Sequence, residues 1–100
     1  MKAAKRYHDY LIKSLKDPEE AAGYLNAALQ DYHRDAFLLA LRNVAEAQGG
    51  LLHLSKRTGL HRVNLYRMLS TKGNPEIRSL EQILKALGLK LAVVPDKMAA

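Results

Sequence analysis

The stretch LLHLSKRTGLHRVNLYRMLSTKG, residues 51–73, decides the fold of this chain. Its first half places four residues on one face of a helix: Leu51, Leu54, Ser55 and Thr58. Its second half again carries apolar residues at helical spacing: Leu60, Leu65, Met68 and Leu69. Between the halves, Gly59 lies where the chain must turn, and such a turn favours a residue that accepts positive φ. The spacing predicts two short helices joined by a tight turn, with small Ser55 allowing a close crossing.

The outer face of the second predicted helix has the composition of a surface that enters a groove. It presents six residues: His61, Arg62, Val63, Tyr66, Arg67 and Ser70. Residues 51–73 as a whole contain five Lys or Arg and no Asp or Glu. Such a mixture is poor for a core and good for contact with a polyanion. The two helices therefore predict a DNA-binding helix-turn-helix.

The second helix of a helix-turn-helix lies in the major groove, and its N-terminal part reaches the base edges. We expect four residues to read bases: Arg62, Val63, Tyr66 and Arg67. Arginine can donate two hydrogen bonds to guanine, and valine can meet a thymine methyl group. Phosphate contact or simple exposure remains open for the two arginines, and Tyr66 can instead cover the core and reach a phosphate. Phosphate contacts are expected from the polar residues Lys56, Arg57, His61, Asn64, Ser70, Thr71 and Lys72.

The distribution of charge supports a polyanionic partner. The net charge of +6 divides into +4 for residues 1–16, −4 for 17–50, +5 for 51–73 and +1 for 74–100. A solvated surface of scattered cations is the alternative, but an acid-free block in a chain with ten acidic residues favours nucleic acid. No aromatic stacking platform accompanies this block, so double-stranded DNA is favoured over RNA.

The residues before the core predict two helices. A basic tail leads into a short helix from about Tyr7 to Leu15, and this tail is either a frayed terminus or an arm that contacts DNA. Asp17, Pro18 and Glu20 then form a capping box that opens a helix to about Asp31. The expected apolar stripe of this second helix is Ala21, Ala22, Leu25, Ala28, Leu29 and Tyr32.

Two further helices flank the central pair. Asp35 is a plausible cap for a strongly apolar helix that ends at Gly49 and Gly50. Its apolar residues are Phe37, Leu38, Leu41, Val44 and Ala45. After a turn at residues 73–75, Ser79 and Gln82 form a second capping-box pattern. The last helix that they open carries Leu80, Ile83, Leu84 and Leu87 on one face, and Gly88 ends it.

The C-terminal residues change from helical to alternating periodicity. In LKLAVV, residues 89–94, three apolar residues alternate with their neighbours: Leu89, Leu91 and Val93. A lone strand in a helical chain leaves its backbone groups unpaired, so pairing with the same strand of a second copy is the economical solution. An extended tail packed on its own subunit is the alternative. The prediction is one domain of residues 1–100, with a helical extension (1–35), a helix-turn-helix core (36–88) and a strand (89–95).

The residues of the core and its flanks also resemble a known family. The patterns RxNLYRMLSxxGNP at residues 62–75 and LxxILKALGLKL at residues 80–91, with DPEEAAGYLNAAL at 17–29, resemble HigA-like addiction-module antidotes with a lambda-repressor-like (XRE-type) helix-turn-helix. The resemblance covers about nine-tenths of the chain. Two departures stand out: Ser55 occupies a position that is usually Ala in the superfamily, and His61 one that is commonly Ser, a better N-cap.

The resemblance implies an all-α bundle of five to six helices and a homodimer joined through the C-terminal strand. It also implies an antitoxin of a type II toxin–antitoxin module that represses its own promoter at an inverted-repeat operator. The implied partner is a small basic toxin, a RelE-like ribonuclease, which an acidic segment between Asp17 and Glu46 would suit. An ordinary solvated helical face is the alternative for this segment. A stand-alone phage-type regulator without a toxin is the alternative, and sequence separates the two poorly.

Other classes of function are disfavoured. The histidines, His8, His33, His53 and His61, include no pair at the spacing of a helical metal site, and the chain has no Cys. No nucleophile with a base beside it and no glycine-rich phosphate loop is suggested, so we expect no catalytic residue, metal or cofactor. No apolar run approaches the roughly 18 residues of a membrane span, which favours a cytoplasmic protein without a membrane partner.

Overall fold

The computed structural model describes residues 2–30 and 33–96, and in these residues it contains six α-helices and no β-strand. The helices are α1 (Lys2–Ser14), α2 (Pro18–Gln30), α3 (Arg34–Ala47), α4 (Gly50–Thr58), α5 (Arg62–Met68) and α6 (Ile77–Ala86). The predictions of an all-α fold and of five to six helices are confirmed. No described helix has the length and apolarity that would be needed to cross a membrane.

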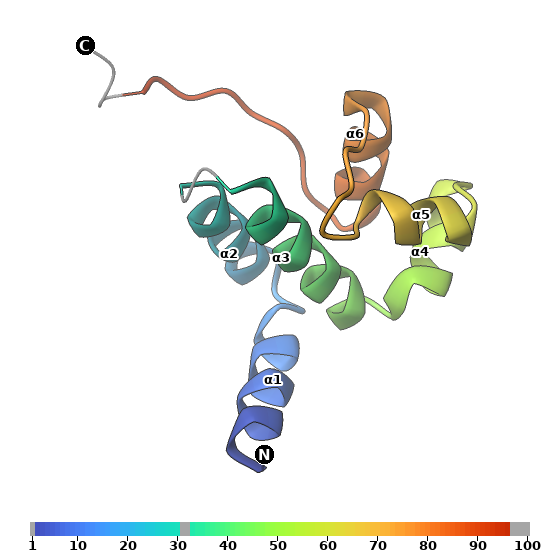
Figure 1. The fold of residues 1–100 in the computed structure, drawn as a ribbon. Helices are drawn as coiled ribbons and strands as arrows, with labels where there is room; N and C mark the ends of the chain where they lie inside the picture. The colour runs from blue at the N-terminus through green and yellow to red at the C-terminus, as the bar shows by residue number, and fades with distance from the viewer. Residues whose placement is uncertain (1, 31–32, 97–100) are drawn as a thin grey trace.

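Helix α3 forms the centre of the core. It contributes six buried residues: Leu38, Ala40, Leu41, Val44, Ala45 and Ala47. It packs against α1, α2 and α4, while α4 packs against α5 and α6 (Figure 1). The expected apolar face of α3 is therefore correct, except that Phe37 is only half-buried. A hydrogen bond of 2.8 Å from Asn43 Nδ2 to the Tyr24 hydroxyl joins α2 to α3 on their polar flank.

Helix α1 is longer than predicted. It begins at Lys2 rather than near Tyr7, because residues 2–6 are helix-forming Lys, Ala and Arg with no glycine or proline among them. None of its residues is buried, although Leu11 and Ile12 pack against the core, and its N-terminal end projects away from the other helices (Figure 1). His8 Nε2 lies 3.0 Å from Glu46 Oε2, an exposed contact between α1 and the last turns of α3.

Helix α2 begins where predicted. Asp17 Oδ1 accepts a hydrogen bond of 3.0 Å from the Glu19 N–H, which caps the helix. The reciprocal bond of a capping box is not needed, since the Asp17 N–H donates to the Ser14 carbonyl oxygen. Along the predicted stripe, Ala21 and Leu25 are buried, but Leu29 is exposed. The predicted end at Asp31 and the predicted stripe residue Tyr32 lie outside the described residues.

Helices α3 and α6 begin earlier than the expected caps. Asp35 lies in the first turn of α3, where it accepts from the Ala36 N–H, and the N-cap position is His33. Helix α6 begins at Ile77 after Glu76, so Ser79 lies inside the helix and is not a cap. Its predicted apolar face is confirmed, with Ile83, Leu84 and Leu87 buried and Leu80 half-buried.

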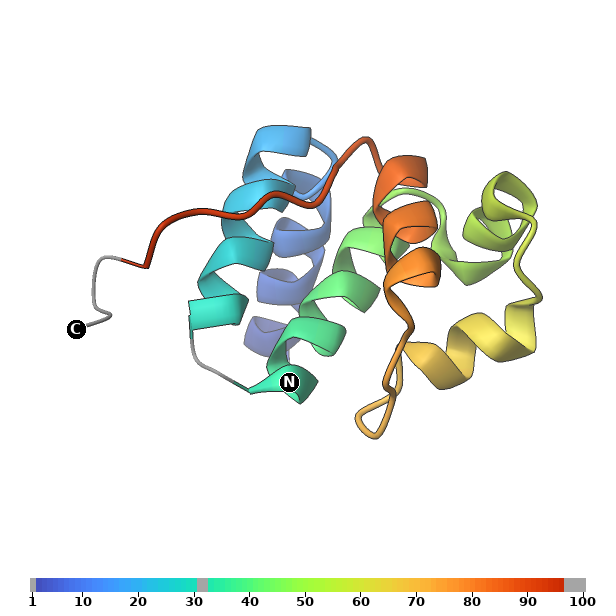
Figure 2. The ribbon, with the colours of Figure 1, turned by 90° about the horizontal axis from the view of Figure 1, so that it is seen from above.

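The C-terminal segment, residues 89–96, is extended and passes over α2 (Figure 2). Within the described chain no strand pairs with it, and the Leu89 N–H bonds back to the Leu84 carbonyl oxygen. A groove of about 590 Å³ lies between this segment and α2, α3 and α6. Its apolar lining includes Leu25, Leu29, Phe37, Leu84, Leu89 and Leu91.

Candidate nucleic-acid interface

The turn between α4 and α5 is closed by its own side chains. Gly59 adopts φ +78°, as predicted, and its N–H donates to the Ser55 carbonyl oxygen at 2.9 Å. The Ser55 hydroxyl donates to the Leu60 carbonyl oxygen, which lies on the far side of the turn. The Thr58 hydroxyl donates to the Leu54 carbonyl oxygen and accepts from the Leu60 N–H at 3.1 Å. These bonds fix the direction in which α5 leaves α4.

The start of α5 is capped by a histidine side chain. His61 is the N-cap residue, and its Nδ1 accepts a hydrogen bond of 3.1 Å from the Val63 N–H. In a neutral imidazole an accepting Nδ1 leaves the proton on Nε2, so the exposed ring retains one donor. The helix is therefore still capped, although this position carries histidine where serine is common in the superfamily. The histidine also adds an N–H donor beside the cationic surface.

Helix α5 separates an apolar inner face from an exposed outer face. Leu65 and Leu69 are completely buried, and Leu60 and Met68 are half-buried, as predicted. On the other side Arg62 and Arg67 are exposed, together with Val63 at 53% and Tyr66 at 69%. Among residues 2–30 and 33–96, no carboxylate forms an ion pair with either arginine. The four predicted base readers therefore share one free surface.

The end of α5 is held by a close backbone contact. The Ser70 hydroxyl donates to the Arg67 carbonyl oxygen at 2.8 Å, and the Gly73 N–H donates to the Ser70 carbonyl oxygen at 2.9 Å. A Cβ atom on Gly73 would lie 2.0 Å from the Met68 carbonyl oxygen, so only glycine fits at this position. The loop that carries exposed Thr71 and Lys72 is consequently held against the C-terminus of α5.

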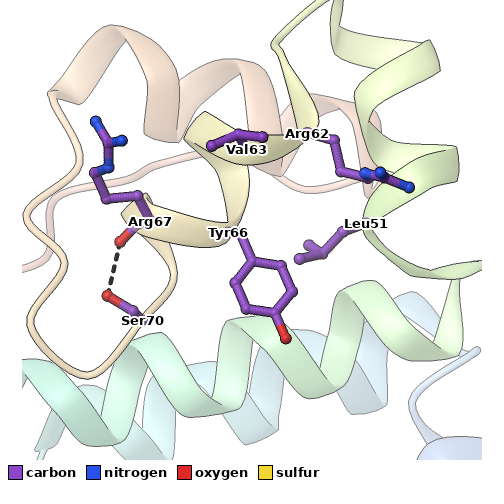
Figure 3. Close-up of a pocket in the computed structure, with 6 residues that line it drawn as sticks. All are labelled: Leu51, Arg62, Val63, Tyr66, Arg67 and Ser70. Atoms are coloured by element: carbon purple, nitrogen blue, oxygen red, sulfur yellow. Dashed lines mark hydrogen bonds between the residues drawn. The ribbon is translucent and has the colours of Figure 1, made fainter.

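A shallow hollow of about 570 Å³ lies on the outer side of α5 (Figure 3). Its lining residues are Leu51, Arg62, Val63, Tyr66, Arg67 and Ser70. The two guanidinium groups point to opposite sides, and the ring of Tyr66 extends from α5 beside Leu51 (Figure 3). The sequence placed Leu51 on one helical face with Leu54, Ser55 and Thr58. In the structure Leu51 is half-buried against the core and also lines this hollow, which helical spacing alone cannot show. The hollow thus combines an apolar floor with two cationic edges.

The other predicted phosphate-contacting residues surround this surface to different extents. Lys56 and Arg57 are exposed in the last turn of α4, and Asn64 is exposed on α5. Ser70 differs from the prediction of a free side chain, since it is half-buried and its hydroxyl proton is used within the chain. It retains acceptor capacity only. Of the residues predicted to contact phosphates, those whose side chains are exposed are therefore Lys56, Arg57, His61, Asn64, Thr71 and Lys72.

Comparison with known proteins supplies one family and one relative. Residues 7–95 match the family described as "Probable addiction module antidote protein". The chain is 33% identical over 89 residues to an uncharacterized protein of Haemophilus influenzae. The aligned residues make up 89% of this chain and 91% of that protein. The search of solved structures found none that matches.

Proposed function

Because the chain belongs to the family of probable addiction module antidote proteins, we propose that it is the antitoxin of a type II toxin–antitoxin module and represses its own promoter. It binds double-stranded DNA through a lambda-repressor-like helix-turn-helix made by α4 and α5. The family match supports the antitoxin role. The exposed, unpaired cations of α5 support the role on DNA, and this single observation carries the mechanism.

The recognition helix in this proposal is α5, which enters the major groove with its outer face. Arg62 and Arg67 donate to guanine, while Val63 and Tyr66 contact the bases between them. Lys56, Arg57 and Lys72 hold the phosphates on either side, helped by the His61 ring, Asn64 and Thr71. The fixed turn at Gly59 and the tight contact at Gly73 support this role, because they hold both ends of α5 in place.

A dimer is needed for useful selectivity. One α5 helix reads only a few base pairs, whereas a two-fold dimer doubles the contacts and requires an inverted-repeat operator. We assign the dimer contact to residues 89–95, with Leu89, Leu91 and Val93 as its apolar side. This segment is extended, and Val93 is fully exposed in the single chain. The adjacent apolar groove supports the assignment, since a second copy can cover it.

The toxin partner is assigned to the acidic half of the chain. The proposed toxin is a small basic protein, a RelE-like ribonuclease, and opposite potentials would speed the encounter. Asp17 caps α2 and Glu46 meets His8, so these two acids are already used. Glu19 and Glu20 are exposed in the first turn of α2 and form no ion pair with the described residues. They are the charges that we expect a basic toxin to meet.

The proposal is tested by comparing DNA affinities. Duplexes from the chain's own promoter region and random-sequence duplexes are titrated with the native protein and with Arg67→Ala. We expect the native protein to prefer the promoter, and Arg67→Ala to lose about 1–3 kcal/mol of that preference. Lys72→Ala is the matched control, because loss of a phosphate contact lowers both affinities equally. No preference in the native protein would overturn the regulatory role.

The toxin role has a separate test. A tagged copy is co-expressed with the product of the adjacent gene, and the complex is purified at micromolar concentration. A stable complex that is weakened by Glu19→Lys with Glu20→Lys supports the antitoxin role and its assigned surface. A protein that binds its promoter but no neighbouring gene product would instead be a stand-alone regulator.

A further inference from the structure

The hollow on α5 contains apolar surface on the side that carries the cations. Leu51 from α4 and Val63 and Tyr66 from α5 form its floor, while Arg62 and Arg67 border it (Figure 3). Phosphates gain nothing from an apolar floor. Among the groups that the four base pairs present in the major groove, the C5-methyl group of thymine is the apolar one.

We propose that this hollow is a methyl-binding subsite for one thymine in each operator half-site. The inference rests on the proposed DNA-binding function and specifies what that function recognises. Val63 meets the methyl group directly, and Leu51 and the Tyr66 ring complete its apolar surroundings. Leu51 thereby becomes a specificity residue supplied by the helix that does not itself enter the groove.

The spacing of the two arginines gives the position of this thymine. Arg62 and Arg67 are separated by five residues, about 7.5 Å along a helix axis. That distance corresponds to about two base-pair steps of 3.4 Å when the helix follows the groove. The hollow lies between the arginines, so the thymine lies between the two base pairs that they read. Electrostatic complementarity supports this occupant, because residues 51–73 contain five cations and no acid.

The test removes only the methyl group. The preferred duplex is first selected from a random-sequence library with the full chain, and the thymine is located between the positions whose preference depends on Arg62 and Arg67. Replacing it with deoxyuridine in one half-site should weaken binding about four-fold, the equivalent of about 0.8 kcal/mol for one buried methyl group. The same replacement at a thymine outside the half-sites should change nothing.

Protein variants then show whether Val63 is responsible. Val63→Ala should reduce the difference in affinity between the thymine and deoxyuridine duplexes, whereas Val63→Thr, whose remaining methyl group can still meet the thymine methyl, should keep more of that difference. The residue is 53% exposed, so both variants should fold, and circular dichroism checks this. A half-site without thymine there, no loss with deoxyuridine, or an equal loss in Val63→Ala would each overturn the inference. Each of these outcomes leaves promoter preference intact, whereas failure of the proposed function removes it.

Discussion

The hydroxyl of Ser55 in α4 donates a hydrogen bond to the carbonyl oxygen of Leu60, the second residue of the turn that leads into α5. The bond crosses the turn that directs α5 outward. It satisfies a half-buried backbone acceptor that would otherwise have no partner among the described residues. Ser55 therefore does more than leave room for the crossing of two helices, because it also ties them together.

Replacing Ser55 with Ala should lower the free energy of unfolding by about 1 kcal/mol, because one hydrogen bond to a half-buried acceptor is lost. Urea unfolding followed by circular dichroism measures the change. Ser79→Ala is the matched control, since the half-buried Ser79 hydroxyl has no hydrogen bond among the described residues. Equal effects of the two changes would show that the Ser55 bond contributes nothing.

Two glycines should respond to alanine in opposite ways. Gly73→Ala places a methyl group 2.0 Å from the Met68 carbonyl oxygen, so we expect a loss of about 3 kcal/mol from forced movement of the backbone. Gly23→Ala meets nothing within 4 Å and lies inside α2, so it should stabilise the chain by about 0.5–1 kcal/mol. Thermal unfolding of both variants at equal protein concentration gives the comparison. A tolerated Gly73→Ala would mean that the loop at residues 71–73 moves freely.

The histidine cap of α5 can be compared with a second histidine in the same position of another helix. His61→Ala should cost about 1 kcal/mol, because the Val63 N–H loses its acceptor, and His61→Ser should restore most of that loss. His33 is the N-cap residue of α3 but makes no capping hydrogen bond through its side chain, so His33→Ala should be nearly neutral. Urea unfolding at neutral pH measures all three. A greater loss in His33→Ala than in His61→Ala would contradict the assigned cap.

The proposed dimer contact makes one prediction about assembly. Val93→Asp should convert a dimer into a folded monomer, since a buried charge at the centre of an apolar contact is costly and Val93 has no packing role within the single chain. Sedimentation velocity measures the mass over a range of concentrations. Tyr10→Asp alters an exposed aromatic residue on α1 and should leave the mass unchanged. A Val93→Asp protein that still forms the dimer would place the contact elsewhere.

Sequence patterns predicted the buried faces better than the ends of the helices. Residues on the buried side of a helix recur with the helical period. Leu65, Leu69 and Ile83 were identified by that spacing, and all three are completely buried. Helix starts depend on weaker local preferences. Helix α6 begins after Glu76, which makes no capping hydrogen bond through its side chain, although the stronger signal was Ser79 three residues later. The added residues Ile77 and Arg78 are exposed, so burial does not explain the earlier start. The added turn instead gives the Leu80 N–H a partner, the Glu76 carbonyl oxygen at 2.9 Å.

The sequence predicted which residues form the candidate surface but not the shape of that surface. An acid-free stretch with helical spacing suffices to place Arg62, Val63, Tyr66 and Arg67 on one exposed side. The hollow that they form with Leu51 depends on the angle between α4 and α5, which the bonds of Ser55 and Thr58 set. No periodic pattern in the sequence encodes that angle between the helices. The involvement of Leu51 therefore required coordinates.

The two proposed binding surfaces, one for a toxin and one for DNA, lie on different helices around α3. Glu19 and Glu20, the proposed toxin-facing charges, belong to a helix that packs on one side of α3, and the DNA-facing helix α5 is attached through α4 on another. One continuous core, which includes Leu25 of α2, Leu41 of α3 and Leu65 of α5, joins these halves. Chimaeras that exchange the halves between relatives therefore have to preserve the packing of this shared core. In the proposed function the toxin-facing charges and the DNA-facing arginines lie on different helices, so a surface substitution on α2 is expected to leave operator preference unchanged.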